Sequence, residues 1–310
     1  MQGEDDNGTR ISSVSIVMPA YNEAAIIGKV VARLRTRFPA AEVIVVDDKS
    51  EDDTAKLAGI AGAKVVRHLY NMGNGAAIKT GARHASGEIL VFMDADGQHD
   101  DRDVPRLIEK IEEGYDLVIG ARGFESQASM LRGLGNKMLN WFASIMTGHR
   151  ILDLTSGFRA ARRQPFLEFL YLLPNGFSYP TTSTMAFLRS GHPVTNVPIK
   201  ARSRVGKSKI NLLSDGMRFL VIIMRVSTLF SPMRLFLPLG LLFFALGLGR
   251  YLYFYLQTSQ FSAMAGVLFI TSVLIFLIGL VSEQITTLHY GLSRVHARSS
   301  NHREHERGNL

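Results

Sequence analysis

Short apolar runs alternate with amphipathic stretches from residue 14 to residue 199. The runs predict β-strands at Val14–Met18, Glu42–Val46, Lys64–Arg67, Ile89–Met93, Asp116–Ile119 and Val194–Ile199. Helices are predicted where apolar residues recur every three or four positions, and the clearest such stripe holds Ile26, Ile27, Val30, Val31 and Leu34. Strands that alternate with helices in this way indicate an α/β fold, with a mostly parallel sheet and helices on both faces.

The remaining elements of this part are less regular. Helices are predicted to begin at Asn22 or Glu23 and at Asp52 or Asp53, and to cover residues 76–85, 104–113, 130–147 and 181–190. Residues 153–159 are predicted to form a loop. Residues 211–234 are apolar on all sides apart from a few charges, which is typical of an interfacial helix that leads into a membrane.

Two long apolar segments follow, at residues 235–256 and 263–282. A helix needs about 20 apolar residues to cross a bilayer, and both segments reach that length. A short polar link joins them, so residues 235–285 predict a transmembrane hairpin. The alternative is a helical hairpin buried inside a soluble protein.

Basic residues set the expected orientation of the hairpin. The link at residues 257–262 holds no Lys or Arg, while arginines stand on both sides of the hairpin, so both flanks are predicted to be cytoplasmic. Residues 1–11 form an acidic tail that lacks the apolar centre of a secretory signal. We therefore expect an integral protein of the inner or plasma membrane, with its head (residues 12–210) and its basic tail (residues 286–310) in the cytoplasm.

Composition narrows the class further. The chain has 310 residues, of which 46% are hydrophobic, and it has no cysteine. These values exclude a disordered chain, a disulfide scaffold, thiolate metal sites and a cysteine nucleophile. The net charge of +8 favours anionic partners such as phosphates, nucleic acid or an acidic membrane. A basic surface that faces a membrane explains this charge without a nucleic-acid partner.

Polar clusters follow four predicted strands, at residues 19–23, 47–48, 94–96 and 120–122. The carboxyl ends of parallel strands meet at one edge of a sheet, where α/β proteins bind ligands. The spacing of Asp94 and Asp96 lets two carboxylates converge, and such hard oxygen ligands suit Mg²⁺ or Mn²⁺. Gln98 and His99 are further candidates for this metal site. The alternative is a pair of aspartates that serve a turn or cap a helix.

Other residues at this edge are candidates for nucleotide binding. Tyr21 offers an aromatic face to a base, while Glu23 and Asp48 offer carboxylates to ribose hydroxyls or base N–H groups, unless all three serve only turns. Gly73 and Gly75 allow a ligand to approach the backbone closely, or they mark the plain start of a helix. Neither a P-loop nor a dinucleotide-binding glycine motif occurs at these turns.

Five arginines are candidates for phosphate clamps, because a guanidinium fork matches two phosphate oxygens at once. They are Arg122, Arg132, Arg159, Arg202 and Arg204. Taken singly, each is more simply explained as a solvated or membrane-facing charge. Their grouping near the membrane end of the head favours a phosphate headgroup as a ligand.

Five motifs stand in a fixed order along the head. They are VMPAYNE (residues 17–23), VVDDKS (45–50), MDADGQH (93–99), IGAR (119–122) and LTSGFR (154–159). Together they resemble glycosyltransferase family 2, and most of all its polyprenyl-phosphate branch, which includes dolichyl-phosphate mannose synthases. The likeness runs over residues 12–210. It implies a GT-A fold and an inverting, metal-dependent transfer of a sugar from a UDP- or GDP-sugar to a polyprenyl phosphate.

The resemblance also implies a role for each matching residue. The nucleotide-binding group comprises Pro19, Tyr21, Glu23, Asp48 and Asp94. The metal ligands comprise Asp94, Asp96 and Gln98. The catalytic group comprises Asp96, Arg122 and Arg132, of which the two arginines face the donor and acceptor phosphates. The acceptor phosphate is also bound by Ser156 and by Arg202, for which Arg204 is an equal alternative.

Other readings of the sequence stay open beside this one. The acceptor could be another lipid, such as a glycerolipid. The chain could instead be a nucleotidyltransferase on a related sheet, or an inactive membrane scaffold that keeps the nucleotide pocket. A homo-oligomer, a tetramer in known members of the branch, is expected by analogy alone.

Overall fold

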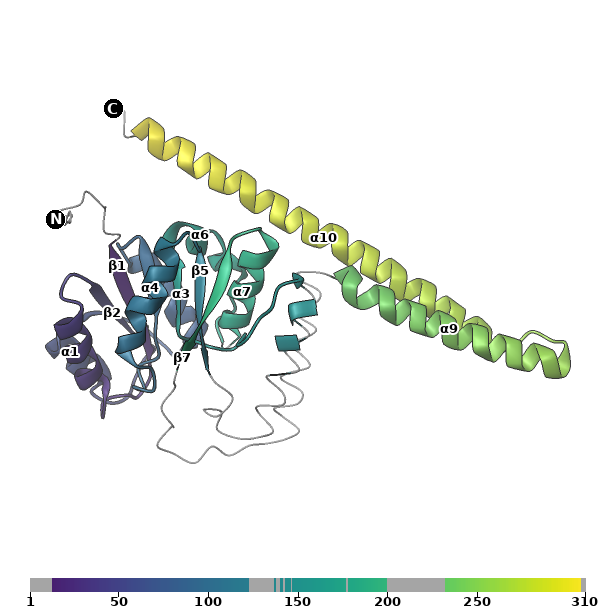
Figure 1. Ribbon diagram of the computed structural model, residues 1–310, viewed down its shortest axis with the longest axis horizontal. Helices are drawn as coiled ribbons and strands as arrows, with labels where there is room; N and C mark the ends of the chain where they lie inside the picture. Colours follow the sequence, from purple (N-terminus) through teal and green to yellow (C-terminus); the bar gives the residue numbers. More distant parts are fainter. Residues whose placement is uncertain are drawn as a thin grey trace. The chain divides into compact units, whose positions relative to one another are not determined.

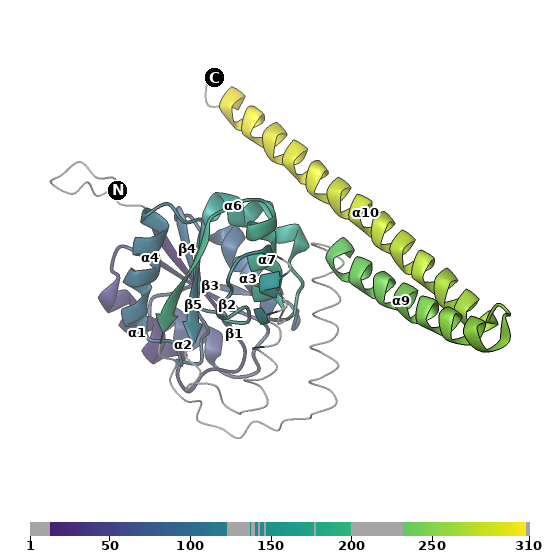
Figure 2. The ribbon, with the colours of Figure 1, turned by 45° about the vertical axis from the view of Figure 1, so that its right-hand side comes forward.

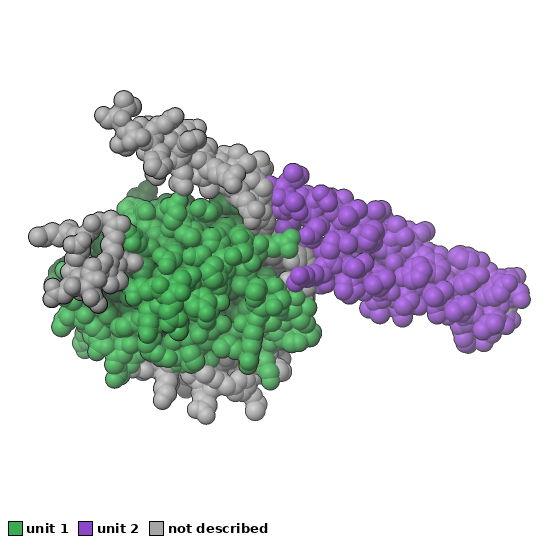
Figure 3. All heavy atoms as spheres, turned by 45° about the horizontal axis from the view of Figure 1, so that its top comes forward, with its two compact units in different colours: residues 1–219 green, residues 220–310 purple. Residues whose placement is uncertain are grey.

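The structure is a computed structural model. It describes residues 13–122, 137, 140, 141, 143–145, 147–176, 178–199 and 232–307, with the backbone alone for residues 258 and 289–307. The chain forms two compact units, Met1–Phe219 and Leu220–Leu310 (Figure 3). The first unit carries the predicted sheet, and the second carries the two long apolar helices.

A seven-stranded sheet forms the centre of the first unit (Figure 1). Its strands are β1 (Val14–Ala20), β2 (Glu42–Asp47), β3 (Lys64–Arg67), β4 (Ile89–Phe92), β5 (Leu117–Arg122), β6 (Arg159–Arg162) and β7 (Val194–Ile199). Their order is β3-β2-β1-β4-β6-β5-β7. All neighbours pair in parallel except β6, which is antiparallel to both β4 and β5. The prediction of a mostly parallel sheet is confirmed.

Helices cover both faces of this sheet (Figures 1 and 2). They are α1 (Ile27–Arg37), α2 (Thr54–Ile60), α3 (Asn74–His84), η1 (Asp101–Asp103), α4 (Val104–Glu112), α6 (Arg163–Glu168), η3 (Leu170–Leu172) and α7 (Tyr179–Arg189). On one face, α1, α2 and α4 share a buried apolar core with alternate residues of β1 and β2, such as Ile16 and Val43. On the other face, α3 packs on β1, while the ring of the α6 residue Phe166 packs at a tilt against Phe92 of β4 with ring centres 4.6 Å apart.

The strand β6 was not predicted from the sequence. Its residues, Arg-Ala-Ala-Arg, include neither β-branched nor aromatic side chains, which strands usually favour. Ala160 and Ala161 are fully buried, and their strand is bonded on both sides. Tertiary pairing with β4 and β5 therefore overrides the weak local preference, and the predicted loop at residues 153–159 ends one residue early. The short helices α6 and η3 were also missed.

Because β6 runs against its neighbours, its first residue lies at the edge where the other strands end. Arg159 pairs with Phe92 near the end of β4 and with Ile119 of β5. This edge therefore gathers the segments that follow β1, β2, β4 and β5 together with the loop that precedes β6.

The second unit is a helical hairpin made of α9 (Pro232–Thr258) and α10 (Ala263–Arg307). Residues Pro232–Gln257 and Ala263–Leu288 are long and apolar enough to cross a membrane, and the most apolar 18-residue windows within them have mean hydropathies of 1.8 and 2.7. Only 11% and 17% of the residues in their most apolar windows are buried, which does not fit the alternative of a soluble core hairpin. The helix α10 continues to residue 307, so the part of the expected tail that is described is helical. The predicted interfacial helix lies outside the described residues up to residue 231.

Candidate active site

The loops that follow β1 and β2 are tied together. The backbone N–H groups of Asn22 and Glu23 donate to Ser50 Oγ at 2.9 Å and to Thr54 Oγ1 at 2.8 Å. In return, the N–H of Glu51 donates to Asn22 Oδ1 at 2.9 Å. Asn22 has a φ of 56°, a left-handed conformation that asparagine tolerates. The tie holds Tyr21 at the edge with 46% of its surface exposed, so that its ring is open to a ligand.

Asp48 is the most heavily bonded of the predicted nucleotide-binding residues. Its carboxylate accepts hydrogen bonds from the N–H groups of Met72 and Gly73, both at 2.8 Å. His68 Nδ1 lies 2.7 Å from Oδ1, and His68 Nε2 lies 2.9 Å from Thr80 Oγ1. Asp48 is only 4% exposed. Its carboxylate therefore orders the turn before α3, and a carboxylate's spare lone pairs leave room for one further donor.

The chain's own backbone leaves no room for a side chain at Gly73 or Gly75. A Cβ atom on Gly75 would lie 2.1 Å from the carbonyl oxygen of Pro174, and one on Gly73 would lie 2.5 Å from that of Asn175. Gly73 also has a φ of 98°, which glycine adopts without strain. Close packing of α3 on residues 174–176 thus accounts for both glycines, without a ligand.

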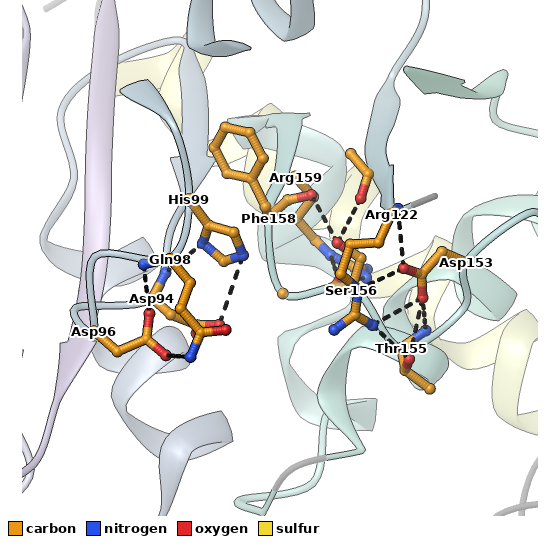
Figure 4. A network of polar contacts seen from close by, with 12 residues as sticks. Asp94, Asp96, Gln98, His99, Arg122, Asp153, Thr155, Ser156, Phe158 and Arg159 are labelled. Carbon is orange, nitrogen blue, oxygen red and sulfur yellow. Dashed lines mark hydrogen bonds and ion pairs between the residues drawn. The ribbon is translucent and has the colours of Figure 1, made fainter. Parts of the chain in front are cut away.

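Asp94 and Asp96 follow β4 and lie at the edge as predicted (Figure 4). Gln98 is bound to Asp96: its backbone N–H donates to Oδ1 at 3.0 Å and its side-chain amide donates to Oδ2 at 2.7 Å. Gly157 packs directly on Asp94, because a Cβ atom at that position would lie 3.2 Å and 3.3 Å from the two carboxylate oxygens. The structure thus brings the three predicted metal ligands together.

His99 lies beside Asp94 and bonds to its backbone. Its Nδ1 accepts the backbone N–H of Asp94 at 3.2 Å, and its Nε2 lies 3.9 Å from Asp94 Oδ2. The ring stacks on Phe158 with centres 4.9 Å apart (Figure 4). Since Nδ1 accepts a proton donor, it carries no proton itself, which leaves Nε2–H directed toward the carboxylate. The hydrogen bond at Nδ1 thus ties His99 to the backbone of Asp94 and places its ring beside the carboxylate.

The surroundings of Asp94 disfavour its ionised form. The Asp94 side chain keeps 39% of its exposure, yet protein atoms surround it closely. This desolvation raises the pKa of Asp94 above its usual value, and Asp96 raises it further, while His99 and Arg122 oppose the rise. A cation bound between the two carboxylates would remove the repulsion between them.

These residues fit a divalent cation that is shared with a substrate. Among the described residues, no group of three or more His, Asp or Glu side chains is placed to hold a metal ion by itself. Two carboxylates and an amide are nevertheless what Mg²⁺-type sites commonly supply when substrate phosphates and water complete the coordination. The donor set therefore suits a metal that arrives with, or is completed by, a diphosphate.

Arg122, at the end of β5, is paired with Asp153. Its Nε and Nη2 reach Asp153 Oδ2 and Oδ1 at 2.7 Å and 3.1 Å, and Nη2 also donates to Thr155 Oγ1 at 2.9 Å. Burial alone would raise the pKa of Asp153, but the bonds from Arg122 lower it. Within the described residues no partner takes up Nη1 of Arg122. The pair therefore fixes the guanidinium and leaves one edge for an anion.

The structure corrects the predicted role of Arg159. It is fully buried, and its guanidinium is bonded to Ser156, Pro180, Ser183 and Thr184. The prediction that it is a phosphate clamp is therefore wrong. Ser156 is also fully buried, and its hydroxyl donates to the Gly120 carbonyl at 2.6 Å, so its predicted contact with a phosphate needs that bond to break.

Not every predicted residue can be placed. Arg132, Arg202 and Arg204 lie outside the described residues, and their roles stay predictions. Asp153, Thr155 and His68 were missed from the sequence. Asp153 and Thr155 stand within or beside the LTSGFR motif, but nothing in that motif indicates which arginine the carboxylate meets.

Comparison with known proteins places this geometry in a family. Residues 15–170 match "Glycosyl transferase family 2" and residues 231–288 match "GtrB C-terminal hairpin". The chain therefore belongs to glycosyltransferase family 2 and is a glycosyltransferase. Solved structures of glucosyl-3-phosphoglycerate synthase from Mycobacterium tuberculosis align with a TM-score of 0.57 at 24% identity, over 70% of this chain and 79% of theirs. The predicted GT-A fold with a C-terminal helical hairpin is confirmed.

Several relatives share much of the sequence. Glycosyltransferase AglJ of Haloferax volcanii is 31% identical over 89% of this chain and 95% of its own. Undecaprenyl-phosphate mannosyltransferase of Micrococcus luteus is 32% identical over 64% of this chain and 87% of its own. Undecaprenyl-phosphate 4-deoxy-4-formamido-L-arabinose transferase of Yersinia pestis is 30% identical over 72% of this chain and 79% of its own.

Proposed function

We propose that this protein transfers a sugar from a UDP- or GDP-sugar to the phosphate of a polyprenyl lipid. The observation that carries the proposal is the meeting of Asp94 and Asp96 with the Arg122–Asp153 pair at one sheet edge, in a chain with two helices of membrane-spanning length. The lipid-phosphate acceptors in the names of two relatives support it.

The donor nucleotide is proposed to lie along this edge. Tyr21 would face the base, while Pro19, Glu23 and Asp48 border the nucleoside. The diphosphate would lie against Asp94, Asp96 and Gln98 with a divalent cation, Mg²⁺ or Mn²⁺, which stabilises the charge that develops on a leaving diphosphate. One solved structure of the M. tuberculosis synthase contains Mn²⁺ with UDP at a TM-score of 0.57, which supports a divalent cation here.

The acceptor phosphate is its own nucleophile. A phosphate monoester has a second pKa of about 6, so it is largely a dianion at neutral pH and needs no general base. One of its oxygens attacks C1 of the sugar opposite the nucleotide, the new C1–O bond forms, and the electron pair of the broken C1–O bond leaves with the nucleoside diphosphate. Attack from the opposite face inverts the configuration at C1.

Arginines are proposed to bind the donor and acceptor phosphates, to shield them from solvent and to align them for the reaction. Arg122, oriented by Asp153, is proposed to bind the donor diphosphate through Nη1, which has no partner among the described residues. Arg132, Ser156 and either Arg202 or Arg204 are proposed for the acceptor. Fixed positive charges at this position favour the charge of the leaving group more than that of the bound donor.

The hairpin explains where the reaction takes place. A long prenyl chain stays in the bilayer, so its phosphate lies at the membrane surface. We infer that the head and both termini lie on the cytoplasmic side, since the link between the helices holds no Lys or Arg. A homo-oligomer remains a prediction.

A donor panel tests the proposal. Membranes that contain the protein are incubated with UDP- and GDP-sugars and undecaprenyl phosphate, and the masses of the lipid products are measured by mass spectrometry. The expected result is a lipid phosphate heavier by one sugar, with release of a nucleoside diphosphate. Transfer to glycerolipids alone, release of pyrophosphate, or binding of a donor without turnover would each overturn it.

A further inference from the structure

Arg159 is a buried cation that the proposed reaction does not use. Its side chain is fully buried, and its guanidinium donates to backbone carbonyls on two segments, Ser156 O at 3.1 Å and Pro180 O at 2.9 Å. It also donates to the hydroxyls of Ser183 at 2.8 Å and Thr184 at 3.2 Å. The loop before β6 is thereby joined to the first turn of α7.

No carboxylate among the described residues pairs directly with this guanidinium. A buried ion without a partner is expensive to desolvate, and an apolar side chain of similar size would avoid that penalty. What the guanidinium adds is a rigid fork of hydrogen bonds. These bonds hold the loop in which Gly157 packs directly on Asp94.

Tyr179 acts on the same loop from the same helix. Its ring covers the guanidinium of Arg159, with the Cζ atom 5.7 Å from the ring centre. Its hydroxyl donates to the carbonyl of Gly157 at 3.2 Å. Burial raises the pKa of Tyr179 far above its usual value, so the hydroxyl keeps its proton and remains a donor.

The loop that these two residues hold is the surface against which Asp94 rests. The carbonyls of Ser156 and Gly157 are bonded to Arg159 and Tyr179, and Gly157 also packs against the Asp94 carboxylate. The next residue, Phe158, stacks on His99, which in turn accepts the N–H of Asp94 (Figure 4). Any displacement of the loop must therefore move Asp94.

We propose that Arg159 and Tyr179 are positioning residues that hold the Ser156–Phe158 turn against Asp94 and so set the place of this carboxylate for the metal–nucleotide complex. The inference rests on the proposed function, because it assigns Asp94 to that complex. Neither residue is expected to touch the substrate.

The test compares three variants of the full chain in detergent or nanodiscs. Tyr179→Phe removes one hydroxyl from the loop, and Gly157→Ala places a methyl group against Asp94. Thr182→Val is the matched control, because it removes a buried hydroxyl of the same helix that donates at 3.2 Å to Ser178 O, away from the loop. The readouts are the affinity for Mn²⁺ in the presence of UDP or GDP, the donor KM and kcat, and the thermal midpoint.

Tyr179→Phe is expected to weaken Mn²⁺ binding in the nucleotide complex about fivefold, the effect of one lost hydrogen bond. Gly157→Ala is expected to weaken it too, because the added methyl group would lie 3.2 Å from an Asp94 carboxylate oxygen and push that carboxylate aside. Thr182→Val should leave that affinity unchanged, although its thermal midpoint falls by as much as that of Tyr179→Phe. Wild-type affinity in both loop variants, or an equal loss in Thr182→Val, would overturn the inference. An unsubstituted chain that binds neither nucleotide with Mn²⁺ would instead overturn the proposed function itself.

Discussion

Asp94 and Asp96 are separated by one residue but lie in different surroundings. Asp94 is enclosed by His99, Gly157 and a nearby positive charge, and its pKa is raised mainly by desolvation. Asp96 is bonded to Gln98 alone in the contacts that the described residues make. The two carboxylates therefore differ in how they are held, Asp96 by Gln98 and Asp94 by packing against Gly157 and by the bond of its backbone to His99.

Replacement of Asp96 by alanine tests its assigned role. The variant should lose much more than about tenfold in turnover at saturating Mg²⁺ or Mn²⁺, because the charge on the leaving diphosphate is no longer stabilised. The measurement is the initial rate of lipid-linked sugar formation. Asp103→Asn is the control, because the carboxylate it removes pairs with Arg106 at the start of α4 and not with a predicted site residue. Near-normal transfer by Asp96→Ala would contradict the assignment.

At the residue scale, spacing alone was enough to predict the acidic cluster but not to sort the arginines. Asp94, Asp96 and Gln98 follow a strand directly, so the end of β4 brings them to the edge. Arg122 and Arg159 were both predicted to bind phosphate, yet one is half-buried beside Asp153 and the other is fully enclosed. The difference comes from the antiparallel insertion of β6, which no local pattern indicates.

The junction between α3 and residues 174–176 is the element on which the nucleoside side of the site depends. Asp48 bonds to the turn at Met72 and Gly73, and α3 then packs closely on the carbonyls of Pro174 and Gly176. The N–H of Ala76 donates to Asn175 O at 3.0 Å. A change in this packing should therefore be felt at Asp48.

Gly75→Ala is predicted to loosen this junction. Alanine is the better helix former by about 1 kcal/mol, but its Cβ would lie 2.1 Å from the Pro174 oxygen, and overpacking of this kind costs about 1–3 kcal/mol. The net loss of stability should be accompanied by weaker binding of UDP or GDP, measured by calorimetry. Gly176→Ala, whose Cβ meets nothing within 4 Å, serves as the control and should bind as the unsubstituted chain does.

At the opposite edge of the sheet, Glu42 joins the starts of several strands. Its carboxylate accepts hydrogen bonds from Ser15 Oγ at 2.7 Å, from the N–H of Ser86 at 2.9 Å and from Lys64 Nζ at 3.0 Å. Burial alone would raise the pKa of Glu42, but these bonds outweigh it and lower the pKa from 4.5 to about 2. Because the folded value is the lower one, the stabilisation is complete above pH 4.5 and is lost as the pH falls toward 2.

Glu42→Gln should therefore destabilise the head at neutral pH by about 1–3 kcal/mol. The difference from the unsubstituted chain should shrink as the pH falls below 4.5. Urea unfolding at a series of pH values measures this, followed by the fluorescence of Trp141, the one tryptophan of the chain. A difference that stays constant down to pH 2 would show that Glu42 does not carry the pH dependence.

Most elements of the head were predictable because their strands are apolar runs with turn residues at both ends. β3 and β7 begin and end where the sequence predicts, and β1, β2 and β4 differ by one or two residues at one end. β5 starts one residue later than predicted and ends three residues later, at Arg122. The predicted helix starts were less accurate, since α1 begins at Ile27 rather than at Asn22 or Glu23, and α2 begins at Thr54. Asp53 precedes the helix without a side-chain bond, while Asp52 Oδ1 accepts the N–H of Thr54 at 3.0 Å. Adjacent aspartates offer the same chemistry, so the backbone turn decides between them.

At the scale of the whole molecule, the chain divides chemistry and membrane attachment between two compact units. The residues that gather at the sheet edge all belong to the first unit, and both apolar helices belong to the second. The sequence predicted this division because charge is almost absent between Leu235 and Tyr290. The sequence did not predict that α10 continues as one helix to Arg307, because the polar residues there give no clear signal for or against a helix.

A chain that ends after Ser231 tests the division. It should bind UDP or GDP as tightly as the full chain, because the nucleotide side of the site lies in the first unit. Its transfer to undecaprenyl phosphate in vesicles should fall sharply, whereas a short, water-soluble prenyl phosphate should be used at a similar rate in both. Full activity of the shortened chain on the long lipid would show that the hairpin does not serve the acceptor.

The proposed attack of the acceptor phosphate on C1 can be followed through the oxygen atoms of the reaction. A nucleotide-sugar is prepared with ¹⁸O in the bridge between C1 and the diphosphate, and the masses of the products are measured by mass spectrometry. All of the label is expected to leave with the nucleoside diphosphate and none to appear in the lipid-linked sugar, because a phosphate oxygen of the acceptor forms the new bond to C1. Label in the lipid product, with release of a nucleoside monophosphate, would show that a sugar phosphate is transferred instead.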